Sequence, residues 1–151
     1  FDHYRCFCRL KIKKDERVIY EFLQETFPDS VMAKEELYLN SHKVDLYLET
    51  LGKHIFIEID DENHFLKAGP RQNLDREVMR FFLEQNEEDT YFIRIPTKAV
   101  YCQETLLILE DFIKTVQNDN KKILLFMTSP VNRYLPLGIP EDEYEIHHVT
   151  Q

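Results

Sequence analysis

The sequence has little glycine and lacks the glycine-based motifs of several large enzyme classes. Only 3 of its 151 residues are Gly and no low-complexity segment occurs, which argues against a disordered chain. It contains neither a phosphate-binding Gly loop nor a G-x-S-x-G elbow, so nucleotide-driven and α/β-hydrolase functions have no support. No apolar run approaches the roughly 18 to 20 residues that span a membrane, and no secretory h-region occurs. Since 43% of the residues are hydrophobic, we expect a single domain with one core and no membrane partner.

Cysteine is also scarce. Three Cys cannot all pair, which favours a reducing, intracellular compartment, whether cytoplasmic, nuclear or viral. His3, Cys6 and Cys8 form a candidate zinc site, but their spacing is not one of the usual zinc patterns. A fourth ligand would have to come from Cys102, His147 or His148. We favour the alternative, in which these cysteines are packed or free.

The formal net charge of -9 argues against a chain that is basic throughout, although binding to nucleic acid requires only local positive charge. Basic residues cluster in three places, at 9–14, at 71–80 and at 121–122. Because many acidic residues lie elsewhere, the fold could still present one basic face. The chain begins without Met, which is consistent with a domain cut from a longer protein that has further domains or a partner protein.

Hydrophobic periodicity predicts a mixed arrangement of helices and strands. Helical spacing begins near Glu16, with Asp15 as the expected N-cap. The strand-like runs alternate apolar and polar residues. The expected order is helix 16–27, strands 32–39, 43–49 and 54–60, helix 74–86, strand 90–96, helix 104–117 and strand 121–128. We expect an α/β fold, a mixed central sheet flanked by helices, with residues 129–151 as an irregular tail packed on or trailing from the domain.

The central hairpin brings carboxylates together. A tight turn at Leu51-Gly52 would use the backbone freedom of glycine and would place Asp45 opposite Glu58. Asp60 lies two residues further along, on the same face as Glu58. Like charges that oppose each other in a sheet repel, so the spacing predicts a site for a hard divalent cation such as Mg²⁺. The alternative is an acidic end of the sheet that is open to water and neutralised by Lys or Arg from elsewhere.

These residues and their neighbours resemble the PD-(D/E)XK nuclease superfamily, and more closely its very-short-patch-repair-like branch with the EDxHD homing endonucleases. The resemblance rests on a helix glutamate followed by KVDLYLE, IFIEIDDENHF, LDREVMRFF and YFIRIP, and it covers roughly residues 15–95. It departs from the family pattern at Val44, which replaces the usual Pro, and at Asp61, which replaces the common Gly. The resemblance implies a restriction-endonuclease-like αβββαβ core within a nuclease-like domain of residues 1–128.

The resemblance also implies an activity, a Mg²⁺-dependent endonuclease that hydrolyses phosphodiester bonds in DNA, with Mn²⁺ able to substitute. The catalytic residues that it implies are Glu16, Asp45, Glu58, Asp60, His64 and Asp75. Asp45, Glu58 and Asp60 would hold the metal.

His64 is the best placed histidine to act as a general base, because its unperturbed pKa lies near the working pH. Arg71, Arg76 and Arg80 would contact nucleic-acid phosphates if their helix faces the substrate, although a solvated helix face is an equal alternative. Two rival hypotheses remain. In one, the chain is a catalytically inactive nuclease-fold module that binds nucleic acid or a protein partner. In the other, it is an interaction subunit whose partner supplies the basic surface.

Overall fold

The computed structural model describes residues 13–34, 37–38, 42–60, 89–115, 121–128 and 143–150. Its main elements are α2 (Lys14–Thr26), β1 (Val31–Lys34), β4 (Leu46–Thr50), β5 (Lys53–Asp60), β6 (Thr90–Pro96), the 3₁₀ helix η1 (Thr97–Tyr101), α5 (Gln103–Lys114), β7 (Ile123–Met127) and β8 (Tyr144–His148). Two short strands, β2 (Leu37–Tyr38) and β3 (His42–Lys43), pair with each other outside the main sheet. Within the described part, no helix is long and apolar enough to cross a membrane.

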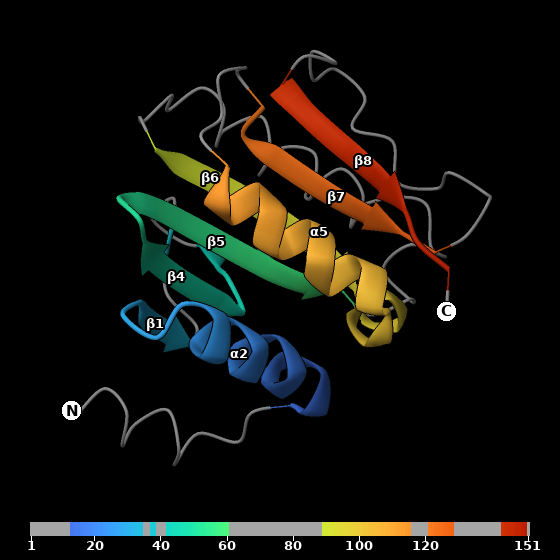
Figure 1. Ribbon diagram of the computed structural model, residues 1–151, viewed down its shortest axis with the longest axis horizontal. Helices are drawn as coiled ribbons and strands as arrows, with labels where there is room; N and C mark the ends of the chain where they lie inside the picture. The colour runs from blue at the N-terminus through green and yellow to red at the C-terminus, as the bar shows by residue number, and fades with distance from the viewer. Residues whose placement is uncertain are drawn as a thin grey trace.

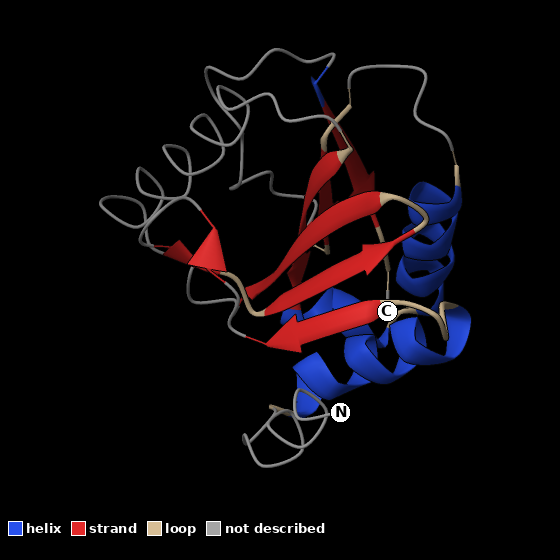
Figure 2. Ribbon diagram, turned by 90° about the vertical axis from the view of Figure 1, so that its left-hand side faces the viewer, coloured by secondary structure: helices blue, strands red, loops and turns tan. Residues whose placement is uncertain are grey.

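The main sheet is mixed, and its six strands are ordered β1-β4-β5-β6-β7-β8 (Figure 1). Strand β4 runs antiparallel to both of its neighbours, β1 and β5, whereas β5, β6, β7 and β8 are mutually parallel. Helices α2 and α5 lie on one face of this sheet (Figure 2). The structure therefore confirms the α/β class and the mixed central sheet.

The hydrophobic core lies between the sheet and the two helices. Helix α2 contributes Ile19 and Leu23, which are four residues apart and therefore share one face of the helix. The strands contribute alternate residues on one face, such as Leu46 opposite Ile57, and all of these side chains are fully buried. This packing fixes the start of α2 against the sheet, close to the end of β5 (Figure 1).

The β4–β5 hairpin has the predicted turn. Leu51 and Gly52 both have positive φ angles, 52° and 76°, as a two-residue turn between twisted strands requires. A Cβ added at Gly52 would meet nothing within 4 Å, so the backbone angle and not space explains the glycine. The register pairs Glu49 with His54, which is the register that a two-residue turn at Leu51-Gly52 sets.

Three parts of the chain differ from the sequence prediction. Helix α2 begins at Lys14 with Lys13 as its N-cap, and Asp15 instead accepts a hydrogen bond from the Tyr101 hydroxyl at 2.5 Å. The single strands expected at 32–39 and 43–49 are divided among β1, β2, β3 and β4. The tail expected to be irregular contains β8, which adds a sixth strand parallel to β7. The predicted helix at 74–86 lies outside the described residues.

Candidate functional site

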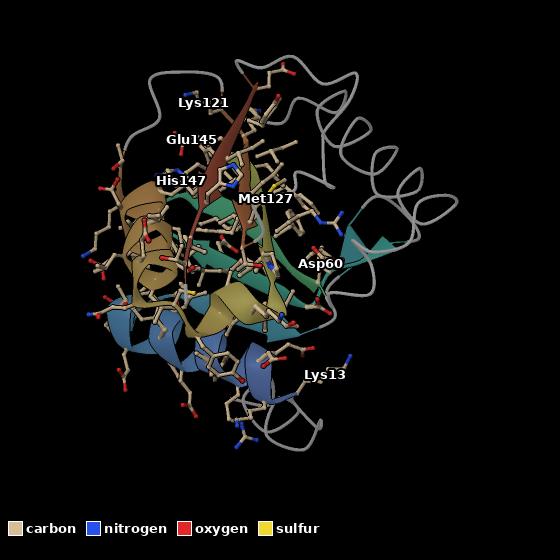
Figure 3. All side chains as sticks on the ribbon, turned by 90° about the vertical axis from the view of Figure 1, so that its right-hand side faces the viewer. Lys13, Asp60, Lys121, Met127, Glu145 and His147 are labelled. Carbon is tan, nitrogen blue, oxygen red and sulfur yellow. The ribbon has the colours of Figure 1, made fainter. Side chains whose placement is uncertain are left out.

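Four of the six predicted catalytic residues lie in described segments, and all four come from one end of the sheet. Asp45 directly precedes β4, and Glu58 and Asp60 belong to the last three residues of β5. Glu16 lies in the first turn of α2, whose N-terminal end is at the same end of the sheet as the end of β5 (Figures 1 and 3). We call these four side chains the acid cluster.

The hairpin holds Asp45 in place. Its Oδ2 atom accepts a hydrogen bond from the backbone N–H of Ile59 at 2.7 Å, across the pair of strands. This contact places the Asp45 carboxylate beside the segment that carries Glu58 and Asp60. The predicted proximity of Asp45 and Glu58 is thus present, although Asp45 stands just outside the paired residues of β4.

Burial and neighbouring charge disfavour the ionised form of Asp45. Burial raises its pKa from the usual 3.8 to about 7, with the negative charge of Glu58 as the second cause. Glu16 and Asp60 raise the pKa further, and only the hydrogen bond from Ile59 opposes the shift. Glu16 and Glu58 are themselves buried. The acid cluster therefore concentrates negative charge where water screens it poorly.

A cation within the described residues lies against this cluster, and its role was not predicted from the sequence. Arg94 of β6 donates two hydrogen bonds to Asp60, from Nε to Oδ2 at 2.9 Å and from Nη2 to Oδ1 at 2.6 Å. Only 3% of Arg94 and 1% of Asp60 is exposed. In the parallel register of β5 and β6, Arg94 also stands directly beside Glu58.

The sequence contained a signal that Arg94 pairs with a carboxylate. It is the one charged residue in TYFIRIP, a run whose seven residues are all buried. A buried charge needs a partner, so an arginine in such a strand predicts a nearby carboxylate. One alternative from the sequence was that Lys or Arg from elsewhere neutralises the acids. For Asp60, Arg94 does so.

The cluster has the ligand chemistry of a magnesium site only in part. Across the described segments, no group of three or more His, Cys, Asp or Glu side chains is arranged to hold a metal ion. Both oxygens of Asp60 accept hydrogen bonds from Arg94, which leaves a ligand role for Asp60 without support. Asp45 and Glu58 remain, and proteins commonly hold Mg²⁺ with one or two carboxylates, water and substrate phosphate. Asp45 and Glu58 match that mode in the number and kind of carboxylates that it uses.

The remaining predicted site residues fall outside the described part of the chain. These are His64, Asp75, Arg71, Arg76 and Arg80, together with His3, Cys6 and Cys8 of the zinc hypothesis. Cys102 is buried and donates to the Lys98 carbonyl at 3.6 Å, and His147 lies 3.0 Å from Glu145.

An aromatic pair lies on the hairpin beside the acids, two residues from Asp45 on β4 and two residues from Glu58 on β5. The rings of Tyr47 and Phe56 are 5.0 Å apart across the two strands, at positions that the register pairs directly. The Tyr47 hydroxyl lies 2.7 Å from Nδ1 of His54. These residues stiffen the hairpin that positions Asp45 and Glu58.

Comparisons with protein-family models, with curated proteins and with solved structures find no match for this chain. The class of protein is therefore inferred from the fold, the acid cluster and the sequence resemblance.

Proposed function

We propose that this protein is a divalent-metal-dependent nuclease that hydrolyses phosphodiester bonds, with DNA as the expected substrate. The order of α2, β1, β4, β5 and β6 is consistent with the restriction-endonuclease-like core implied by the resemblance. In that core, an antiparallel hairpin carries the acids and a parallel strand follows it. The order of elements supports the proposal, but it is not the main evidence for it.

The observation that carries the proposal is the crowding of Asp45 and Glu58. A protein that only needed a stable sheet would gain nothing from two carboxylates whose repulsion helps to raise the pKa of Asp45 to about 7. A bound divalent cation would offset this repulsion and favour the ionised form of both residues. Without a cation, holding Asp45 and Glu58 close together costs electrostatic free energy. This cost is the reason to expect a cation at the site.

The residues then have distinct roles. Mg²⁺ held by Asp45 and Glu58 would polarise the phosphate and lower the pKa of a bound water. The backbone N–H of Ile59 keeps the Asp45 carboxylate oriented, so one oxygen is fixed before the cation arrives. An imidazole nitrogen of His64 would accept the proton of the attacking water. Arg71, Arg76 and Arg80 would bind the phosphates of the nucleic acid.

A specific observation favours a second candidate, the inactive nuclease-fold module. Asp60, one of the three acids assigned to the metal, is held by Arg94 at 2.6 and 2.9 Å, as in a structural ion pair. Such a module would bind nucleic acid or a protein without cleaving it.

A cleavage assay separates the two functions. Supercoiled and linear DNA would be incubated with the protein and Mg²⁺ or Mn²⁺, with single-stranded DNA and RNA as further substrates. We expect metal-dependent cleavage that Asp45→Asn and Glu58→Gln each abolish. The matched control is Glu110→Gln, since Glu110 pairs with Lys114 on the exposed side of α5 and should be dispensable. Activity that survives in Asp45→Asn, or no cleavage of any substrate with either metal, would contradict the nuclease proposal.

A further inference from the structure

We propose that the exposed side of the first turn of α2 binds the phosphate backbone of a nucleic acid, through Lys13, Lys14 and Arg17. We call these three side chains the basic face. The inference rests on the proposed function, from which it takes nucleic acid as the partner. It adds a surface that would hold the strand beside the acid cluster.

The basic face lies beside the acid cluster. Lys14 and Arg17 are three residues apart in α2 and therefore lie on one face of the helix, and Lys13 is the N-cap. All three are exposed, whereas Glu16 of the same turn is buried and belongs to the acid cluster. Figure 3 shows Lys13 at the same end of the molecule as Asp60, the last residue of β5. One helical turn thus presents cations to solvent and a carboxylate to the cluster.

The cations of the basic face have no acidic partner within the described residues. No ion pair joins any of them to a carboxylate there. Glu21 follows Arg17 by four residues, a spacing at which such pairs form, but the two are not paired. The pKa of Asp45 is shifted by burial, by neighbouring acids and by one backbone hydrogen bond, and by none of these cations. Neutralising the acid cluster therefore does not explain the basic face.

The basic face is also unfavourable for the helix that carries it. The N-terminal end of a helix has partial positive charge, so cations there destabilise the helix. In α2 the exposed cations lie at this end, the exposed acids Glu21 and Glu25 lie further along, and the last turn has no basic residue. Other contacts hold the turn in place, since Asp15 accepts a hydrogen bond from Tyr101 and Ile19 is buried in the core. The cations thus add nothing to the fold that an anionic ligand would not explain better.

A nucleic-acid backbone matches this surface in charge and in position. Duplex DNA carries one negative charge per about 1.7 Å of its axis, so several cations on one helical turn can each meet a phosphate. The chain has a formal net charge of -9, and the acid cluster by itself would repel such a polymer. The basic face would offset this repulsion and hold a phosphodiester near Asp45. Contacts of this kind position the strand without reading its sequence.

Fluorescence anisotropy with a labelled DNA duplex measures this contact in the full chain, with Ca²⁺ in place of Mg²⁺ to prevent cleavage. Each phosphate contact contributes about 0.9 to the slope of log affinity against log salt, which is up to about eightfold in affinity at roughly 0.1 M salt. Arg17→Gln should therefore weaken binding by up to about eightfold and lower the slope by about one, equally for duplexes of different sequence. The triple variant Lys13→Gln/Lys14→Gln/Arg17→Gln should lower the slope by about three. The matched control Lys114→Gln removes the same charge from the exposed side of α5 and should leave the slope unchanged.

Thermal unfolding separates binding from a structural role. Because the cations lie at a helix N-terminus, the triple variant should melt at the same temperature as the unsubstituted protein or at a higher one. A lower melting temperature would make the cations structural and overturn the inference. An equal loss of affinity in Lys114→Gln would reduce the effect to net charge and would also overturn it.

The binding and cleavage results together distinguish this inference from the proposed function. If the triple variant binds DNA with the parent affinity and slope, the inference is wrong, whereas metal-dependent cleavage by the unsubstituted protein would leave the proposed function standing. Weaker binding by the triple variant, with no cleavage by the unsubstituted protein, would support the basic face and reject the nuclease. If the unsubstituted protein binds no DNA even at low salt, the inference is wrong and an acidic protein becomes the expected partner.

Discussion

Replacing Asp45 by Asn is expected to stabilise the metal-free protein at and above about pH 7. The pKa of Asp45 is raised from 3.8 to about 7 by burial and by Glu58. Between these two values the native state holds a proton that the unfolded state has released. The free energy of unfolding therefore falls as the pH rises through this window, and the full penalty is present above it. Asn carries no charge at any of these pH values, so the variant escapes the penalty.

The size of the effect follows from the shift. About three pKa units correspond to a penalty on the order of 4 kcal/mol once Asp45 is fully ionised. Between about pH 5 and pH 8, the unsubstituted protein should lose on the order of 3 kcal/mol that Asp45→Asn does not lose. The amide oxygen of Asn can still accept the hydrogen bond that Ile59 donates at 2.7 Å. The substitution thus removes the charge and keeps the contact.

Urea unfolding at both pH values, with EDTA present to remove metal, measures this difference. Glu110→Gln is the matched control, because Glu110 forms an exposed ion pair with Lys114 and should change stability by less than about 1 kcal/mol. If Asp45→Asn is less stable than the unsubstituted protein at pH 8, the carboxylate is stabilised and not strained. The argument from electrostatic crowding would then be refuted.

Three other substitutions or conditions give independent tests. His64→Ala should lower the rate of DNA cleavage by about 10²- to 10⁴-fold and leave metal affinity unchanged, and a parent rate or a loss of metal binding would show that His64 has another role. Lys53→Met should reduce the free energy of unfolding by about 1 to 3 kcal/mol, because it leaves two carbonyls at the end of α5, one of them buried, without their donor. In the structure, Nζ of Lys53 donates to the carbonyls of Ile113 and Thr115, each at 2.6 Å, and unchanged urea unfolding would contradict this role. Affinity for DNA should be measured with Ca²⁺ in place of Mg²⁺. It should fall steeply with added salt and should weaken when Arg71, Arg76 and Arg80 are replaced by Gln. Absence of binding at low salt would point to a partner that supplies the contacts.

The hairpin was predictable because its determinants are local. A two-residue turn with Gly52 fixes the register, and alternation of apolar residues fixes which face is buried. From these alone, Glu58 and Asp60 fall on one face with Asp45 close by. The charge crowding at Asp45 follows from the same register.

Other features depend on contacts between segments that are distant in sequence. The pairing of Arg94 with Asp60 requires the parallel register of β5 and β6, which no turn between adjacent strands determines. Strand β8 is stabilised by pairing with β7, and its residues are only partly buried, so its apolar pattern is weak. The predicted N-cap at Asp15 was wrong because α2 begins at Lys14, so Asp15 lies inside the first turn, where its carboxylate accepts the hydrogen bond from Tyr101 of η1.

Thermal unfolding with increasing Mg²⁺ is the most direct test of the claim that Asp45 and Glu58 share a divalent cation. A ligand that binds only the folded state stabilises it by RT ln(1 + [L]/Kd), so the melting temperature of the unsubstituted protein should rise with Mg²⁺ concentration. The Asp45→Asn and Glu58→Gln variants should start from a higher melting temperature without metal and show no rise. A melting temperature that Mg²⁺ does not change in the unsubstituted protein, or that rises equally in all three proteins, would contradict the account.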